Sequence, residues 1–192
     1  MSAAIRTATS ADAVAVTELI AQAFEPLGAS AYLVPDLSVR REVLAGQFII
    51  MVEHALAVGQ VDVIGAASPV AAAVWFDHTA PVPPPPDYDN RLKAATGQWH
   101  SRFLHLDEVL ESNHPTEPHH FLLFLAVHPD HQNHGLGSAL LDHHHTTALG
   151  GNPAYLDAAS PASRDLYARH GYEGRPPYDI AAGARFWPMW RP

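Results

Sequence analysis

Apolar runs and helical repeats alternate along this chain, and the pattern predicts a mixed α/β fold. The segment Phe121–Val127 is apolar throughout, which suits a buried central strand and is short for a helix. A polar loop follows, and apolar residues then recur at helical spacing, as at Leu136 and Leu140. The stretch 121–148 therefore predicts a strand, a tight loop and a helix that begins near Gly135.

The N-terminal third predicts a strand and two helices. A short strand is expected over 3–7, and Thr9 or Ser10 then caps a helix with a regular apolar face. A loop is expected over 26–36, beginning at a proline. A second helix is expected over 38–58, although its central FIIMV would also suit a strand.

The middle of the chain predicts a hairpin, a proline-rich connector and another helix. The apolar runs 61–67 and 70–76 are separated by a serine and a proline, which predicts an antiparallel pair. The proline-rich segment 79–87 cannot continue a sheet, and a stiff connector explains it better than a docking site for a proline-reading domain. Aromatic and leucine residues at helical spacing over 88–110 predict the helix.

The C-terminal part predicts short strands around one helix. Strands are expected over 153–158, 172–180 and 184–190, the later ones interrupted by prolines. A helix is expected over 161–170, and a turn joins the last two strands. The two C-terminal tryptophans are expected to cover the sheet.

Composition adds limits to this picture. The chain has 192 residues, 47% of them hydrophobic, which suits one domain over 1–192 with a substantial core. No run approaches the ~18 apolar residues that a membrane span needs, and the N-terminus lacks the features of a signal peptide. Cysteine is absent, which excludes a cysteine nucleophile and disulfides. We therefore expect a cytoplasmic protein that does not bind a membrane.

The formal net charge of −9 excludes some partners. A large basic face for nucleic acid is not expected on such a chain. An acidic surface attracts cationic ligands or serves solubility, and solubility is the commoner reason.

A glycine pattern marks the point where the central loop turns into its helix. Gln132, Gly135 and Gly137 form Q-x-x-G-x-G. Glycine has no Cβ, so a ligand can approach the backbone closely. The first N–H groups of a helix have no internal partner, and the helix dipole adds partial positive charge there. The turn is therefore a candidate phosphate cradle, although it is neither the three-glycine dinucleotide fingerprint nor a P-loop.

Two sequence blocks resemble those of a known family. The stretch VHPDHQNHGLGSALL, residues 127–141, resembles the acetyl-coenzyme A loop of the GCN5-related N-acetyltransferases (GNAT), which usually reads V-x-P-x-x-Q/R-x-x-G-x-G/A. The block 156–172 resembles their later strand–helix segment, which ends in L-Y-x-x-x-G-F/Y. The resemblance implies a GNAT-type α/β domain with a mixed, bent and splayed sheet flanked by helices. Residues 79–118 depart from the simplest family plan as an inserted arm and helix, which we expect to narrow the acceptor pocket.

The resemblance also implies acetyl-coenzyme A (acetyl-CoA) as the co-substrate. Its diphosphate would bind main-chain amides of the turn, and its pantetheine arm would bind backbone groups at the end of the central strand. Ser160 and Ser163 lie where family members often have polar residues that touch the cofactor. The expected cofactor-binding residues are Leu125, Ala126, Val127, Gln132, Asn133, His134, Gly135, Leu136, Gly137, Ser138, Ser160 and Ser163.

Candidate catalytic residues follow from the same resemblance. Tyr167 matches the usual general acid for the leaving thiolate, and a phenol with a pKa of about 10 is a proton donor at neutral pH. The alternative is a tyrosine that only bonds the cofactor sulfur or packs in the core. Some family members carry a glutamate base where this chain has Phe121. His119 lies on the same strand face and is our candidate base, with an ordered water as the alternative. Rivals for this role are Glu117, Asp77 and His120.

The 14 histidines do not predict a metal site. They cluster at 128–134 and at 143–145, but consecutive histidines on a helix point in different directions. Zinc sites need converging ligands, often with a cysteine or carboxylate among them. We therefore expect no bound metal.

The function predicted is an N-acetyltransferase that moves an acetyl group from acetyl-CoA directly to a primary amine of a small molecule or peptide. One alternative is a non-catalytic acyl-CoA-binding sensor or scaffold of the same fold, and another is a longer-chain acyltransferase. The sequence carries no signature of the acceptor. A homodimer fits the family resemblance, but no interface can be identified.

Overall fold

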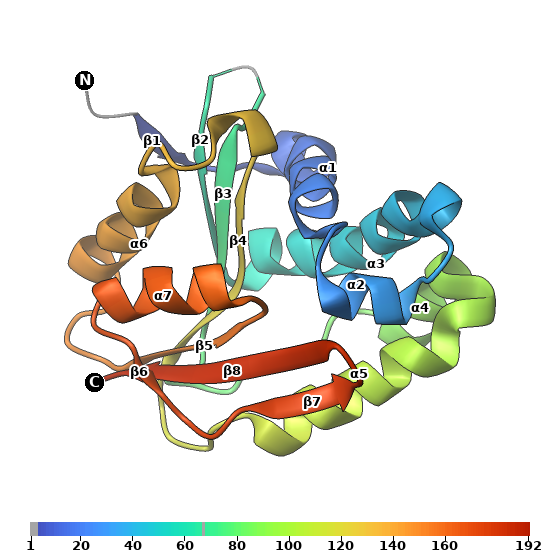
Figure 1. Cartoon of the computed structure of the whole chain (residues 1–192). Helices are drawn as coiled ribbons and strands as arrows, with labels where there is room; N and C mark the ends of the chain where they lie inside the picture. The colour runs from blue at the N-terminus through green and yellow to red at the C-terminus, as the bar shows by residue number, and fades with distance from the viewer. Residues whose placement is uncertain (1–3, 67) are drawn as a thin grey trace.

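A mixed sheet forms the middle of the molecule, and its two halves run in different directions (Figure 1). The structure is a computed structural model that describes residues 4–66 and 68–192. In spatial order, the strands are β1 (Ile5–Thr7), β2 (Gln60–Ile64), β3 (Ala71–Asp77), β4 (His120–Val127), β5 (Ala154–Ala158), β8 (Ala184–Arg191) and β6 (Glu173–Gly174). A further strand, β7 (Tyr178–Ala181), pairs with β8. Within the described chain, β4 and β5 form the one parallel pair. The predicted mixed α/β fold is confirmed.

Helices cover both faces of this sheet (Figure 1). They are α1 (Ala13–Phe24), α2 (Gly28–Leu33), α3 (Leu37–Val58), α4 (Tyr88–Thr96), α5 (His100–Asn113), α6 (Leu136–Thr147) and α7 (Pro161–Arg169). The apolar faces of α1 and α3 form one core with β2–β4, while α6 and α7 form another on the opposite face. A smaller cluster joins α2 and α5 to β7 and β8. No helix in the described ranges is both long and apolar enough to cross a membrane.

The two halves of the sheet separate beside the central strand. β4 pairs with β3 along its whole length, from His120 to Val127. Its parallel pairing with β5 ends at Leu122, opposite Leu156. Beyond Leu122, one edge of β4 therefore has no strand beside it, as expected for a splayed sheet.

An irregularity in β4 coincides with this separation. The β3–β4 register shifts between Val74 and Trp75, so that Leu123 is an extra residue on β4. A bulge of this kind interrupts the alternation along the strand, so two successive side chains lie on the same face and the backbone hydrogen-bonding directions are reversed beyond it. Leu123 and Phe124 are these two residues, and both pack with the α1–α3 core.

Most predicted elements are confirmed, and the exceptions have physical causes. The expected loop 26–36 contains α2, which the short sequence GASAYL does not signal by itself. Gly28 lies against the backbone of Gly183 in the β7–β8 turn, so tertiary packing selects this helix. The predicted strand over 172–180 is two strands because its prolines cannot donate to a ladder.

The inserted segment is also more divided than predicted. One helix was expected over 88–110, but α4 ends at Thr96 and α5 begins at His100. Gly97 has a φ of 50°, which lies outside the right-handed helical region and breaks the run. The proline-rich stretch before α4 has no regular structure, as expected for a connector.

Parts of two predicted strands lie outside the described residues. These parts are Ala3 in the expected strand 3–7 and Ala67 in the expected strand 61–67. The described portions form β1 and β2, and β2 and β3 make the predicted antiparallel pair.

Candidate active site

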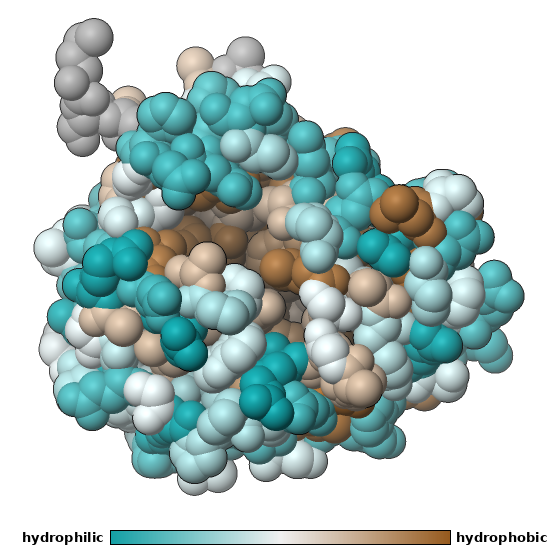
Figure 2. Space-filling view, viewed as in Figure 1, coloured by the Kyte–Doolittle hydropathy of each residue, from teal (hydrophilic) through white to brown (hydrophobic). Residues whose placement is uncertain are grey.

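A cavity of about 1130 Å³ opens where β4 separates from β5. Its walls come from the β4–α6 turn, the start of α7, the α1–α2 region and the inserted segment. Figure 2 shows a hollow with a hydrophobic interior and a hydrophilic rim on this face. Both the phosphate cradle and the expected acceptor region therefore border one space.

The turn before α6 offers a row of free main-chain donors. Within the described ranges, the amides of residues 133–138 donate to no protein acceptor, and the first helical bond runs from Ala139 N to Gly135 O at 2.9 Å. Asn133 and Gly135 have φ values of 62° and 78°, which curl the turn. A Cβ on Gly135 would meet no atom within 4 Å, so the space beside it is open. Such a concave row of amides fits the diphosphate of a coenzyme.

Gln132 has a supporting part in this turn. Its amide donates to Pro129 O at 3.3 Å, and its side-chain Nε2 donates to Val127 O at 3.3 Å. Gln132 therefore ties the turn to the end of β4; it borders the cavity, but its main-chain amide is not free for a ligand. The exposed His134 does not border the cavity with its side chain, but its amide belongs to the free row.

Some backbone groups at the end of β4 point into the gap between β4 and β5. His128 N donates to Val70 O, so the groups of Ala126 also face β3. Those of Leu125 and Val127 face the opposite side, where β5 no longer pairs. Leu125 and Val127 border the cavity, whereas Ala126 packs in the α1–α3 core and is not brought to the cavity wall.

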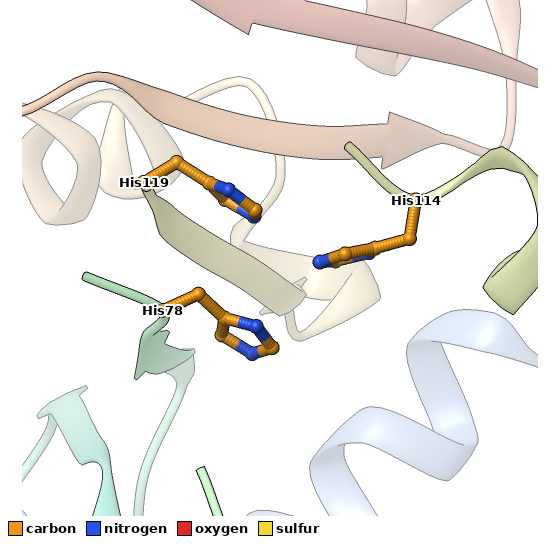
Figure 3. A group of neighbouring side chains, drawn as sticks. All are labelled: His78, His114 and His119. Carbon is orange, nitrogen blue, oxygen red and sulfur yellow. The ribbon is translucent and has the colours of Figure 1, made fainter. Parts of the chain in front are cut away.

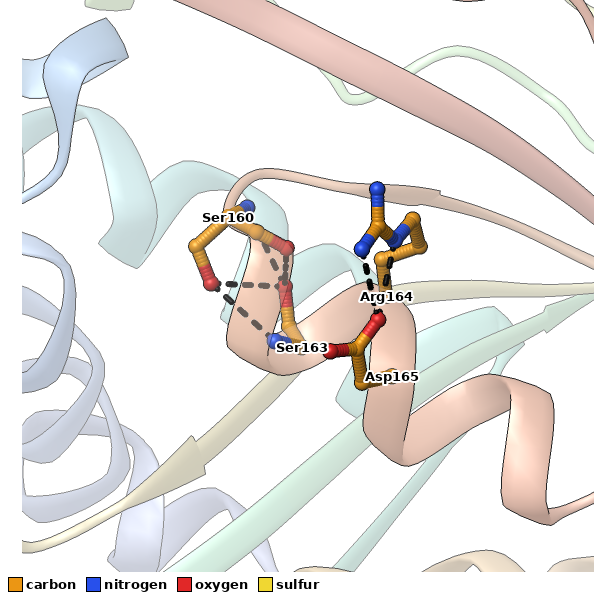
Figure 4. Close-up of polar contacts among 4 residues, drawn as sticks. All are labelled: Ser160, Ser163, Arg164 and Asp165. Carbon is orange, nitrogen blue, oxygen red and sulfur yellow. Dashed lines mark hydrogen bonds and ion pairs between the residues drawn. The ribbon is translucent and has the colours of Figure 1, made fainter.

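Ser160 and Ser163 form the N-terminal cap of α7 (Figure 4). Ser160 Oγ accepts from Ser163 N at 3.1 Å, and Ser163 Oγ lies 2.9 Å from Ser160 O. Arg164 and Asp165 pair on the next turn, with a shortest distance of 2.8 Å. Both serines border the cavity, but their hydroxyls already hold the start of the helix.

Tyr167 lies on α7 and borders the same cavity. It is 7% exposed and packs with Tyr172 and the α6–α7 core. Burial raises the pKa of its phenol above the ordinary value of about 10, because the charged form is poorly solvated there. The hydroxyl therefore carries its proton at neutral pH.

The candidate base His119 lies behind the cavity wall and not in it. It is 1% exposed, and its Nδ1 lies 2.6 Å from Glu117 O. The rings of His78 and His114, which do border the cavity, lie 5.3 and 4.9 Å from its ring centre. Burial lowers the pKa of all three imidazoles, to about 4 for His114, so they are neutral at pH 7.

The rival bases face elsewhere. Asp77 is exposed and accepts from Thr79 N at 2.9 Å, while exposed Glu117 lies 3.5 Å from Arg175. His120 packs on the opposite face, with its Nδ1 3.2 Å from His144 Nε2. None of these three rivals borders the cavity in the described structure.

The inserted segment forms the far wall and brings acidic groups that the sequence pattern did not reveal. Asp107 accepts from the Tyr88 hydroxyl at 2.9 Å, and burial raises the pKa of this carboxyl to about 6. Glu111 lies one turn further along α5 on the same wall. Val82 and Pro85 of the connector complete this wall, so the insert borders the cavity.

The histidine clusters singled out in the sequence do not converge. His144 stacks on Trp75 with ring centres 3.9 Å apart, while His145 Nε2 lies 3.0 Å from the Tyr172 hydroxyl. The rings of His128 and His131 are 5.7 Å apart on an exposed loop. Ring nitrogens converge elsewhere: His78, His114 and His119 form one group, and His145 forms another with Asp142 and His170.

Known proteins share the segment that carries this site. Residues 103–174 match the family model of the acetyltransferase (GNAT) domain. Residues 103–174 are therefore similar to a GNAT acetyltransferase domain. The matched segment includes β4, the turn before α6, α6, β5 and α7, and so contains the free amides and Tyr167.

Solved structures extend the likeness over the whole chain. A Corynebacterium glutamicum protein described as histone acetyltransferase HPA2 and related acetyltransferase is 27% identical, with a TM-score of 0.76 over 100% of this chain and 97% of that one. A mosquito arylalkylamine N-acetyltransferase like 5b is 16% identical, with a TM-score of 0.63 over 98% of each chain. A Drosophila melanogaster polyamine N-acetyltransferase, described as forming N-acetylagmatine, is 17% identical, with a TM-score of 0.61 over 97% of this chain and 98% of that one. The last two are similar in fold alone.

Proposed function

We propose that this protein transfers the acetyl group of acetyl-CoA directly to a primary amine of a small molecule or peptide. The observation that carries the proposal is the row of free amides at 133–138, which opens onto the same cavity as Tyr167. The first N–H groups of a helix are left for water or a ligand, and here they border a cavity. Their orientation toward open space fits a diphosphate.

The rest of the coenzyme fits the separation between β4 and β5. The free backbone groups of Leu125 can pair with the amides of a pantetheine arm, in place of the missing strand. A thioester carbonyl at this edge would receive a hydrogen bond from a main-chain N–H, which stabilises negative charge as it develops on the oxygen. Because these contacts use main chain, substitutions at Leu125 or Val127 should act through packing.

The proposed chemistry needs one proton acceptor and one proton donor. The amine nitrogen attacks the thioester carbonyl, a C–N bond forms, the C–S bond breaks, and the thiolate takes the proton of Tyr167. The proton lost by the amine goes to a base. His119 is the base favoured by its position before β4, and its ring lies 5.3 and 4.9 Å from the rings of His78 and His114 in the cavity wall. An ordered water in the cavity is the alternative base.

The acceptor side suits a cationic amine. The wall made by the insert carries Asp107 and Glu111, and at pH 7 a carboxyl with a pKa of about 6 is mostly ionised. Most of the remaining lining is apolar, which matches an amine on a hydrocarbon or aromatic body. The polyamine and arylalkylamine acetyltransferases of similar fold support this substrate class.

A thiol-release assay tests the proposal. The full chain is given acetyl-CoA and a panel of polyamines, arylalkylamines, amino acids and peptides. An enzyme releases free thiol only with an accepted amine, whereas a non-catalytic sensor is stabilised against heat by acetyl-CoA and releases none. Tyr167→Phe should slow release more than it weakens acetyl-CoA binding. Tyr172→Phe is the matched control, because Tyr172 is a buried neighbour of Tyr167 that does not border the cavity.

A further inference from the structure

We propose that His78, His114 and His119 form a binding site for a divalent transition-metal ion of the zinc type, in the wall of the acceptor cavity. The three residues follow β3, end α5 and precede β4, so the fold alone brings them together (Figure 3). Each offers a ring nitrogen, and these nitrogens lie within 4.8 Å of one another. Sequence spacing predicts no metal site because the ligands are spread over three segments.

The backbone holds these three rings in place. His78 N donates to His119 O at 2.8 Å, which fixes the two histidines side by side. The ring centres of His78 and His114 are 5.1 Å apart, and Figure 3 shows the three side chains pointing toward one another. Phe121 and Tyr155 pack around them at 4.8 and 5.2 Å from the His114 ring centre. The cluster is therefore built from a packed framework and not from mobile surface side chains.

Two of the nitrogens are unsatisfied. The Nε2 atoms of His114 and His119 are buried without a hydrogen-bond partner in the described structure. Burying a polar atom without a partner is unfavourable, so most such atoms are paired. One metal ion between the rings would coordinate both nitrogen atoms.

The tautomer of His119 suits a ligand. Its Nδ1 lies 2.6 Å from Glu117 O, and a carbonyl oxygen only accepts, so Nδ1 must carry the hydrogen. Nε2 is then left with a lone pair directed toward the other two rings. Metal-binding histidines usually make this second hydrogen bond to a carbonyl or carboxylate, which orients the ring.

The ligand set selects among metals. Three neutral imidazoles suit Zn²⁺, and also Co²⁺, Ni²⁺ or Cu²⁺, and they do not suit Mg²⁺ or Ca²⁺, which prefer oxygen. A tetrahedral zinc ion at about 2.0–2.1 Å holds its ligands about 3.3 Å apart, so the rings must close by up to about 1.5 Å. His78 and His114 border the cavity, which leaves the fourth position facing the space for water or an acceptor group.

The site has a consequence that rests on the proposed function. An imidazole bound to a metal cannot accept a proton with the same nitrogen. If the cluster takes the proton of the amine, a bound metal ion inhibits acetyl transfer.

The test is metal uptake by the full chain without a polyhistidine tag and without coenzyme or amine. Co²⁺ is titrated as the probe, because tetrahedral coordination gives intense visible bands and octahedral surface binding gives weak ones, and Zn²⁺ uptake is measured by equilibrium dialysis. We expect one ion per chain with the intense band. His119→Gln and His114→Gln should each weaken uptake at least about tenfold, while His131→Gln on the exposed loop should not.

Three results decide the proposal. Loss of the intense band in the cluster variants, with circular dichroism unchanged, supports it. Weak bands only, or uptake equal in wild type and the cluster variants, overturn it. If the His119→Gln variant does not fold, the His78→Asn variant replaces it in the comparison with wild type, because His78 is only half-buried. Because binding is read without substrates, a protein that takes up the metal but releases no thiol refutes the proposed function alone.

Discussion

His170 Nε2 lies 2.9 Å from Ser138 Oγ, which joins the end of α7 to the first turn of α6. The other ring nitrogen of His170 lies 2.9 Å from Asp142 Oδ1, so the imidazole is held from both sides. Ser138 borders the cavity and its amide is one of the free donors, whereas His170 stands behind it. His170 therefore orients a residue of the proposed diphosphate site without touching the cavity.

This relationship predicts a positioning role for His170. His170→Gln should weaken acetyl-CoA binding by about 2–10-fold, the range expected for one lost hydrogen bond. The turnover at saturating acetyl-CoA should change little, because the reacting atoms are not affected. Isothermal titration and steady-state kinetics measure the two effects separately. His143→Gln, on α6 outside the cavity, should leave both unchanged, and an equal loss in both variants would refute the role.

Gly135 should be required for the coenzyme and not only for the fold. Its φ of 78° makes an alanine cost about 1–2 kcal/mol in stability. The added methyl group would also enter the open space beside the free amides, so acetyl-CoA affinity should fall by at least about tenfold.

Gly150 offers a matched control for Gly135. It has a φ of 58° in the α6–β5 turn, and an added Cβ there would also meet open space. Gly150→Ala should therefore lose similar stability but keep its affinity for acetyl-CoA. Thermal unfolding with and without acetyl-CoA distinguishes the two variants. Equal affinity in both variants would argue against a diphosphate at this turn.

The sequence predicts the parts of this site that lie in one continuous segment better than the parts that distant segments bring together. The free amides and Tyr167 lie in continuous blocks, so the resemblance of those blocks to GNAT sequences was sufficient to propose them. No sequence motif marks Asp107, His78 or His170, because the residues that each of them contacts lie in distant segments of the chain. The short helix α2 is not predicted for the same reason, whereas the continuous apolar run of β4 predicts its strand locally.

Asp107 predicts a pH dependence of stability. The folded carboxyl has a pKa of about 6, above the value of about 3.9 in an unfolded chain, because burial disfavours its charge. The folded state therefore binds this proton more tightly, and stability falls as the pH rises from about 4 to 6.

Asp107→Asn removes this dependence and should keep the Tyr88 contact, since its amide oxygen can still accept. Its free energy of unfolding relative to wild type should rise by about 1–2 kcal/mol between pH 4 and pH 7. Urea titrations across that range provide the measurement. Asp157, whose pKa is also raised to about 6, is present in both proteins and cancels in the difference. Parallel stability profiles would show that burial does not penalise the charge of Asp107.

The same carboxylate should matter for the acceptor. Asp107→Asn should raise KM for a cationic amine several-fold and leave kcat and acetyl-CoA binding nearly unchanged, because it removes attraction at a distance from the thioester. Glu108→Gln is the control: it changes the charge of α5 by the same amount at an exposed position that does not border the cavity. If both variants raised KM equally, the general acidity of the surface and not Asp107 would be responsible.

The packing of α2 against the β7–β8 turn should require glycine at position 28. A Cβ added there would lie far inside van der Waals contact of the Gly183 carbonyl oxygen, which belongs to backbone and cannot rotate away. Gly28→Ala should therefore destabilise the protein by about 1–3 kcal/mol, the usual cost of forced overpacking.

Gly174→Ala provides the comparison, because a Cβ there would meet no atom within 4 Å. That variant should change the free energy of unfolding by less than about 0.5 kcal/mol in either direction. The α2 helix and the β7–β8 turn form a cluster with α5, whose Asp107 and Glu111 line the acceptor wall. Gly28→Ala should consequently impair amine binding more than acetyl-CoA binding. Unchanged amine KM in a destabilised Gly28→Ala protein would show that the acceptor wall does not depend on this contact.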